Sequence, residues 1–243
     1  MAEKICTWYR NPNLRFFHFH DPFSLSLFFK KKFEKIFTLS AITMMKFISL
    51  FLLSVSALWS EVKSFDFKDA KGVNTVIFQL DALLESINGS AGGISGTVSF
   101  DPESPESTKG SILLEASSLR VDNPVLQEHM HGEDWLNVSK FPHIEFSLSN
   151  VRKISTEGRT VKAVADGKMS IRQVTLKMNI PVEITYLEGM LEKRNRIPGD
   201  LLVVRSKFTV KRDDFGIRPG EYLDKVANEI DISINLAGAC PLE

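Results

Sequence analysis

The sequence predicts an all-β protein of about eight antiparallel strands, and three features of the chain after residue 65 support this prediction. Apolar and polar residues alternate along eight segments, which is the period of a strand with one buried face. Short connections separate most segments, as antiparallel pairing allows, and no strand–helix–strand rhythm occurs. Each strand therefore turns one apolar face toward a common interior. A closed up-and-down barrel and a two-sheet sandwich both satisfy the pattern, and periodicity alone does not choose between them.

The clearest strand covers residues 174–186, where every second side chain is apolar. Leu176, Met178 and Ile180 share one face, and Thr175 lies on the other. A glycine-rich stretch, 89–93, is predicted to form a turn between the first two strands. The predicted strands are 73–80, 94–100, 112–119, 144–151, 161–171, 174–186, 201–210 and 230–236.

One short helix is predicted between the third and fourth strands. Asn123 is a good N-cap, and Pro124 suits the first helical position, where a missing N–H costs nothing. Gly132 is predicted to end the helix because glycine tolerates the left-handed conformation.

The first 64 residues differ chemically from the rest. They hold nine Lys or Arg and four Asp or Glu, a net charge of +5, whereas the remainder carries −5. Lys46 precedes an uncharged apolar run, 47–58, which fits the central region of a signal peptide and is short for a membrane span. We predict an extension, 1–44, upstream of a true start at Met44 or Met45, a signal peptide region, 45–64, and one β-barrel domain, 65–243. The rival interpretations are an uncleaved anchor or a buried helix for the apolar run, and a genuine extended leader for residues 1–44.

Composition excludes several classes of protein. The chain is 43% hydrophobic and 25% charged, which suits one domain with a substantial core. Only Cys6 and Cys240 are present, so a disulfide-rich secreted scaffold is excluded. The acidic balance after residue 64 disfavours nucleic-acid binding.

Four groups of residues in chain order resemble the YceI-like family of lipid- and polyisoprenoid-binding proteins. They cover most of the predicted domain, although Gln127-Glu128 stands where the family often has Arg-Asp, and Gln173 where it often has Gly. The groups are GTVSFD at 96–101, the block 118–146 with its His-Met, Trp-Leu and Phe-Pro pairs, ADGKMSI at 165–171 followed by Val-Thr, and FTVKRDDFG at 208–216.

The resemblance implies an eight-stranded up-and-down antiparallel lipocalin-like barrel with one or two short helices. It implies a non-enzymatic carrier, exported to the periplasm or secreted, that binds a long-chain isoprenoid or other lipid without a cofactor or metal. Membrane contact would be transient, and the oligomeric state stays open, a homodimer included. We expect an apolar lumen lined by Phe78, Phe100, Phe146, Leu176, Met178 and Ile180, and polar residues at the barrel mouth, His129, Arg205 and Arg212.

Two alternative functions also fit the sequence. An exported metal-dependent hydrolase would use His129 and His131, although two histidines spaced i, i+2 on a helix point apart and share a metal only if the helix has ended. A structural or stress module would have a solid barrel. Spare volume inside the barrel discriminates the carrier from the solid module.

Overall fold

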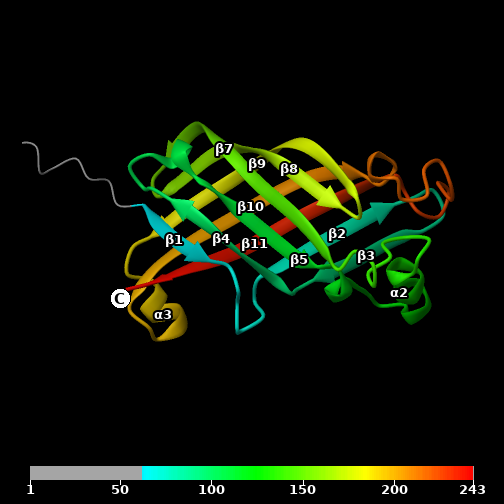
Figure 1. Cartoon of the computed structure of the whole chain (residues 1–243), viewed down its shortest axis with the longest axis horizontal. Helices are drawn as coiled ribbons and strands as arrows, with labels where there is room; N and C mark the ends of the chain where they lie inside the picture. The colour runs from blue at the N-terminus through cyan, green and yellow to red at the C-terminus, as the bar shows by residue number, and fades with distance from the viewer. Residues whose placement is uncertain (1–61, 243) are drawn as a thin grey trace, which may run out of the picture. The chain divides into compact units, whose positions relative to one another are not determined.

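The computed structural model describes residues 62–242, which form an antiparallel β-barrel (Figure 1). The predicted extension, 1–44, and nearly all of the predicted signal region lie outside the described residues, so both remain predictions. None of the helices in the described part is long and apolar enough to cross a bilayer. The strands are β1 (Lys63–Asp66), β2 (Thr75–Asp81), β3 (Ser86–Ala91), β4 (Ile94–Phe100), β5 (Lys109–Glu115), β6 (Arg120–Val121), β7 (His143–Glu157), β8 (Thr160–Ile171), β9 (Val174–Leu187), β10 (Gly199–Lys211) and β11 (Glu229–Pro241).

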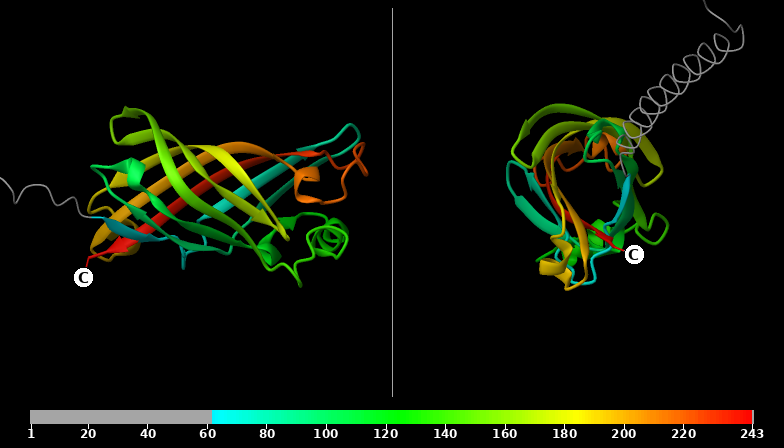
Figure 2. Two further views of the ribbon diagram at one scale, coloured as in Figure 1. Left: turned by 45° about the horizontal axis from the view of Figure 1, so that its top comes forward. Right: turned by 90° about the vertical axis from the view of Figure 1, so that its left-hand side faces the viewer.

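The barrel has eight positions, filled in chain order, as an up-and-down barrel requires. The first three positions are each divided between two short strands, β1 with β2, β3 with β4, and β5 with β6. Strands β7 to β11 fill the other five. The ring closes because β1 and β2 both pair with β11, and Figure 2 shows the strands surrounding one interior. The predicted eight-stranded antiparallel barrel is confirmed.

A single buried side chain bonds to β11 at the closing seam of the barrel, in the gap between its pairing with β1 and its pairing with β2. Asn74 is 5% exposed and lies beside Ala237 of β11, between the residues that pair with β1 and those that pair with β2. Its Nδ2 donates to the carbonyls of Phe67 (2.9 Å) and Ala237 (3.2 Å), and its Oδ1 accepts from the Ala237 N–H (2.8 Å). The side chain thus replaces the missing strand partner of β11.

The glycine-rich stretch was wrongly predicted to be a turn throughout. Gly89 lies inside β3, where a Cβ would meet the Phe78 ring at 2.1 Å, so glycine is needed there for packing. The turn itself is confined to Gly92 and Gly93, the latter with φ +61°. β3 was therefore missed because its glycine makes room for an aromatic ring of β2.

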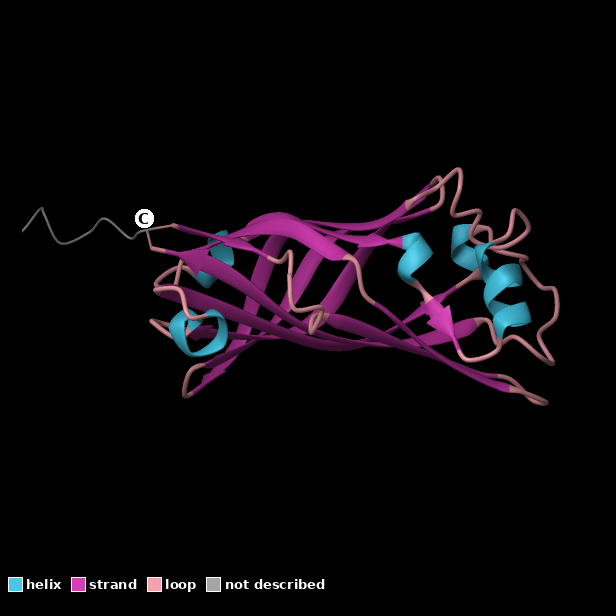
Figure 3. Ribbon diagram, turned by 90° about the horizontal axis from the view of Figure 1, so that it is seen from below, coloured by secondary structure: helices cyan, strands magenta, loops and turns pink. Residues whose placement is uncertain are grey.

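The helices lie at the two ends of the barrel (Figure 3). The predicted helix is α2 (Pro124–His131), and Asn123 Oδ1 accepts from the N–H groups of Val125 (2.9 Å) and Leu126 (3.2 Å). It ends at Gly132, but with φ −65° and not in the predicted left-handed conformation. The second α-helix, α3 (Leu191–Asn195), connects β9 to β10 and buries Leu191.

The interior divides into a packed half and a hollow half. Residues of the packed half include Phe65, Phe100, Ile184 and Leu202, all at most 4% exposed. The hollow half has two smaller clusters of buried side chains, one around Met169 and Val210 and the other around Phe78 and Leu80. Along β9 the even-numbered residues from Val174 to Ile184 are buried or half-buried and the odd-numbered ones from Thr175 to Glu183 are exposed, as the alternation predicts.

Candidate ligand-binding site

The hollow half of the barrel encloses a cavity of about 900 Å3. Inward side chains of eight strands contribute to its wall, because the residues that alternate toward the interior are almost all apolar. The barrel wall of the cavity comprises Val76, Phe78, Leu80, Ile87, Ile94, Ile112, Leu114, Ile144, Phe146, Met169, Ile171, Phe208, Val210, Ile230, Ile232, Ile234 and Leu236. A cavity of this size and polarity is typical of sites for apolar small molecules.

Beyond one end of the cavity, where Ile94 and Leu236 border it, aromatic side chains of the packed half fill the barrel. The rings of Phe65, Phe100 and Tyr186 lie with centroids 6.0–6.3 Å apart. The Tyr186 hydroxyl donates to Asp200 (2.7 Å), and Lys63 forms an ion pair with the same carboxylate (3.0 Å). The barrel is therefore filled at the end where β1 and β10 begin.

This polar cluster shifts two pKa values. Burial and the hydrogen bond to the neighbouring carboxylate raise the pKa of Tyr186 to about 12. Burial alone would raise the pKa of Asp200, but hydrogen bonds from the Gly189 N–H, Tyr186 and Lys63 hold it below its ordinary value. The cluster stabilises the charged form of the carboxylate and the neutral form of the phenol.

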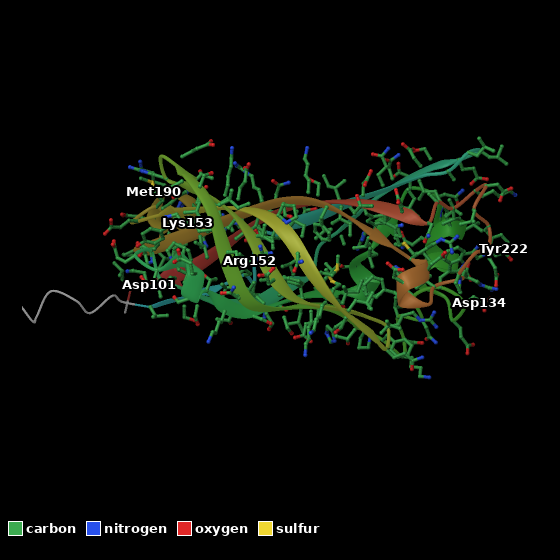
Figure 4. The ribbon with its side chains drawn as sticks, turned by 90° about the horizontal axis from the view of Figure 1, so that it is seen from above. Asp101, Asp134, Arg152, Lys153, Met190 and Tyr222 are labelled. Atoms are coloured by element: carbon green, nitrogen blue, oxygen red, sulfur yellow. The ribbon has the colours of Figure 1, made fainter. Side chains whose placement is uncertain are left out.

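The other end is the mouth, which lies between two segments of chain. Helix α2 with the residues up to 136 forms one side, and the connection between β10 and β11, residues 212–228, forms the other. Arg218 pairs with Asp134 across the mouth (2.5 Å), and the rings of Trp135 and Tyr222 lie 6.3 Å apart. Figure 4 shows Asp134 and Tyr222 at the same end of the barrel.

Arg212 organises the second side of the mouth. It is 1% exposed, and its guanidinium donates to the carbonyls of Ile217, Arg218, Glu221, Val226 and Ala227. It also lies over the Trp135 ring (5.7 Å). Burial lowers the pKa of the group and the adjacent Asp213 opposes the shift, so the charge remains at neutral pH. All five donors are occupied by the connection itself.

Four of the nine residues that the sequence suggested for the site line the cavity. Phe78 and Phe146 belong to its wall, and His129 lies at the mouth. Arg212 also borders the cavity, but its donors are used within the protein, so it holds the connection and offers no donor to a ligand head group.

The other five side chains do not border the cavity. Phe100 belongs to the aromatic end of the packed half. Ile180 belongs to the buried cluster around Met169, and Leu176 and Met178 pack against that cluster, so none of the three is part of the wall. Arg205 is exposed on β10, because residues at odd positions of that strand near it alternate toward solvent. The predicted lining thus included residues of β9, whereas the observed cavity is lined by other strands.

Most of the wall contributed by β5 and β11 was not predicted from the sequence. Ile112, Leu114, Ile232 and Ile234 all border the cavity. The alternation of residues 230–236 had marked one face of β11 as apolar, but periodicity does not reveal which apolar residues face a void and which face other side chains. The mouth residues Trp135, Arg218 and Tyr222 lie in irregular segments and carry no periodic signal.

The two histidine side chains of α2 have different surroundings. His131 Nε2 lies 2.8 Å from the carbonyl oxygen of Leu119, whereas His129 borders the mouth of the cavity. Among residues 62–242, no group of three or more His, Cys, Asp or Glu side chains is arranged to hold a metal ion. His129 and His131 therefore do not converge on one site.

The fold is therefore that of a lipocalin-like barrel, with eight antiparallel strands around an apolar cavity. The sequence matches the YceI-like domain family over residues 66–237, and the chain therefore belongs to this family. The resemblance seen in the sequence is confirmed.

Curated relatives match parts of the chain. A UPF0312 protein of Yersinia enterocolitica is 27% identical over 97 residues, which are 40% of this chain and 48% of the relative. A UPF0312 protein of Photorhabdus laumondii is 24% identical over 143 residues, 59% of this chain and 68% of the relative. The chain thus spans about half the length of the first of these relatives.

Solved structures show the same fold. The crystal structure of Burkholderia cenocepacia BcnA superposes with a TM-score of 0.56 at 19% identity, covering 68% of this chain and 95% of that one. A Campylobacter jejuni YCEI protein gives 0.54 at 20% identity, with coverages of 62% and 83%. A polyisoprenoid binding domain from Saccharophagus degradans gives 0.51 at 8% identity, covering 74% and 100%.

Proposed function

We propose that this chain is an exported, non-enzymatic carrier that binds the hydrocarbon tail of a polyisoprenoid or another long-chain amphiphile inside the barrel. The blind apolar cavity of about 900 Å3 carries the proposal, since it provides volume for a chain and few groups that could do chemistry. The structural likeness to a polyisoprenoid binding domain supports the same ligand class. A periplasmic or secreted location is part of the proposal and rests on the apolar run at 47–58.

Burial of the tail supplies enough free energy without a charged contact. Each buried CH2 contributes ~0.8 kcal/mol, so a chain of about fifteen carbons gains ~12 kcal/mol before the cost of ordering the ligand. A net of about 8 kcal/mol corresponds to micromolar affinity. The polar head would lie at the mouth near His129, Glu128 and Lys225, which border the opening.

The cavity also separates this proposal from the structural module. A solid barrel would have filled the space that Phe78 of β2 and Ile232 of the neighbouring β11 both border. Empty apolar volume forfeits packing contacts, so a protein with no ligand for the space would gain stability from larger side chains there.

A matched pair of variants tests the proposal. Ile232→Trp places a large ring in the cavity, whereas Ile184→Trp places the same ring in the packed half, where the native side chain is 4% exposed. Delipidated protein should bind a prenyl-chain quinone delivered from cyclodextrin at micromolar concentration, and Ile232→Trp should weaken binding about tenfold or more with a modest loss of stability.

Ile184→Trp should behave in the opposite way, losing ~1–3 kcal/mol or more of stability. Ligand binding by its folded fraction should be retained. Native mass spectrometry of the protein from its own source should show a bound long-chain lipid. Folded, delipidated wild-type protein that binds no long-chain ligand would contradict the carrier function.

A further inference from the structure

Exposed apolar side chains gather on two loops beside the mouth. Leu83 and Leu84, at the tip of the β2–β3 hairpin, are 87% and 64% exposed. Tyr222 and Leu223, in the connection between β10 and β11, are 54% and 48% exposed. Isolated exposed apolar residues are common, but four in two pairs of neighbours mark a surface for contact.

The two loops are joined to each other and border the opening. The Leu84 N–H donates to the carbonyl of Asp224 (2.9 Å), so both pairs belong to one surface, which we term the apolar tip. Glu85 and Tyr222, within the same loops, line the cavity. Figure 1 shows the β2–β3 tip beside the orange connection, and Figure 4 places Tyr222 at that end of the barrel.

We propose that the apolar tip, Leu83, Leu84, Tyr222 and Leu223, inserts into the interfacial layer of a lipid bilayer, so that the cavity opens onto the membrane. This inference rests on the proposed carrier function. An amphiphile dissolved in a bilayer would otherwise have to expose its whole tail to water before it entered the barrel, at ~0.8 kcal/mol for each CH2. A mouth whose rim dips among the head groups removes that exposure.

The charges around the apolar tip select the kind of bilayer. Four carboxylates, those of Asp81 at the end of β2 and of Glu85, Glu221 and Asp224, surround the apolar tip. They outnumber the two cations of the connection beside it, Lys225 and Arg218, and Arg218 is already paired with Asp134 and Glu221. This acidic surrounding repels an anionic membrane surface. The membrane that fits is therefore one rich in zwitterionic lipid, held by the apolar side chains and not by charge.

A surface variant and a matched control test the inference. The double variant Leu83→Ser/Leu84→Ser removes half of the apolar tip, and its sites are exposed, so folding should be preserved. Ile154→Ser removes an apolar side chain of β7 that is 68% exposed and lies toward the packed half. Wild type and Ile154→Ser should float with phosphatidylcholine vesicles, and the double variant should lose about tenfold in vesicle affinity.

Further assays distinguish membrane contact from ligand binding. A prenyl-chain quinone presented by cyclodextrin should bind wild type and the double variant equally, whereas its transfer out of donor vesicles should slow about tenfold in the variant. Replacing part of the phosphatidylcholine by phosphatidylglycerol should weaken vesicle binding at low salt, and added salt should restore it.

The outcomes are distinguishable. If no form of the protein binds the quinone from cyclodextrin, the carrier function itself fails. If the quinone binds but wild type and the double variant float equally, or neither floats, the membrane inference is overturned. Stronger binding to anionic vesicles would overturn the choice of lipid. A wild-type dimer that the double variant loses, without vesicle binding, would assign the apolar tip to a second copy of the chain and overturn the inference.

Discussion

Replacing Arg212 by methionine should show how much the connection that forms one side of the mouth contributes to the stability of the protein. Methionine keeps an unbranched apolar stem but lacks the guanidinium, so the variant removes every hydrogen bond to the 217–227 segment. Four of the five acceptor carbonyls belong to buried or half-buried residues, Ile217, Arg218, Val226 and Ala227. At ~1 kcal/mol for each carbonyl left without a donor, the free energy of unfolding should fall by about 4 kcal/mol.

Removing the buried charge offsets part of this loss, since desolvating a guanidinium is itself unfavourable. The carbonyls do not leave with it, however, so the net change remains destabilising. Arg205→Met is the matched control, because Arg205 is exposed on β10 and its replacement should change the free energy of unfolding by less than about 0.5 kcal/mol.

Urea unfolding measures both variants, and hydrogen exchange reports where the loss occurs. Amides of residues 213–228 should exchange faster in Arg212→Met, and the emission of Trp135, which Arg212 covers, should change. A loss below about 1 kcal/mol with unchanged exchange in this segment would refute the assignment of Arg212 as the organiser of the mouth.

Three other measurements test the barrel itself. Asn74→Ala should cost ~2–4 kcal/mol in urea unfolding, since it leaves the Phe67 and Ala237 carbonyls and the Ala237 N–H at the seam unpaired; a change under about 0.5 kcal/mol would mean that the seam closes without it. Ile180→Asp should destabilise by several kcal/mol and Thr175→Asp by less than about 0.5 kcal/mol, and equal effects would contradict the one-sided burial of β9. Because the pKa of Tyr186 is raised to about 12 from an unfolded value of ~10, its contribution to stability is present below about pH 10 and is lost as the pH rises through about 12; alkaline unfolding of Tyr186→Phe should lack this loss.

Alternation predicted the fold well because a strand with one buried face repeats a simple pattern. β4 was predicted with its observed ends, and β9 differs from its prediction by one residue. Strands were missed where their residues do not alternate between apolar and polar. β3 was missed because Gly89 gives its side-chain space to Phe78, and the short β1 presents too few residues for a period to show.

The cavity could not be placed from the sequence because a void is a property of neighbours across the barrel. Met178 and Ile232 both lie on apolar strand faces, yet only Ile232 borders the cavity. Which of them faces empty space depends on the sizes of side chains on other strands, and strand periodicity carries no such information.

The packed half fills the barrel beyond one end of the cavity, and the mouth lies at the other end. Under the proposed function, a ligand would enter tail first and leave head first, and its far end would stop where Leu236 and Ile94 meet the packed half. From Ile230 near the mouth to Leu236, six residues at ~3.3 Å each give a depth of about 20 Å along β11. The affinity for a ligand should therefore rise with the length of its tail until the tail fills this depth. It should then level off, because any further carbons remain outside the cavity.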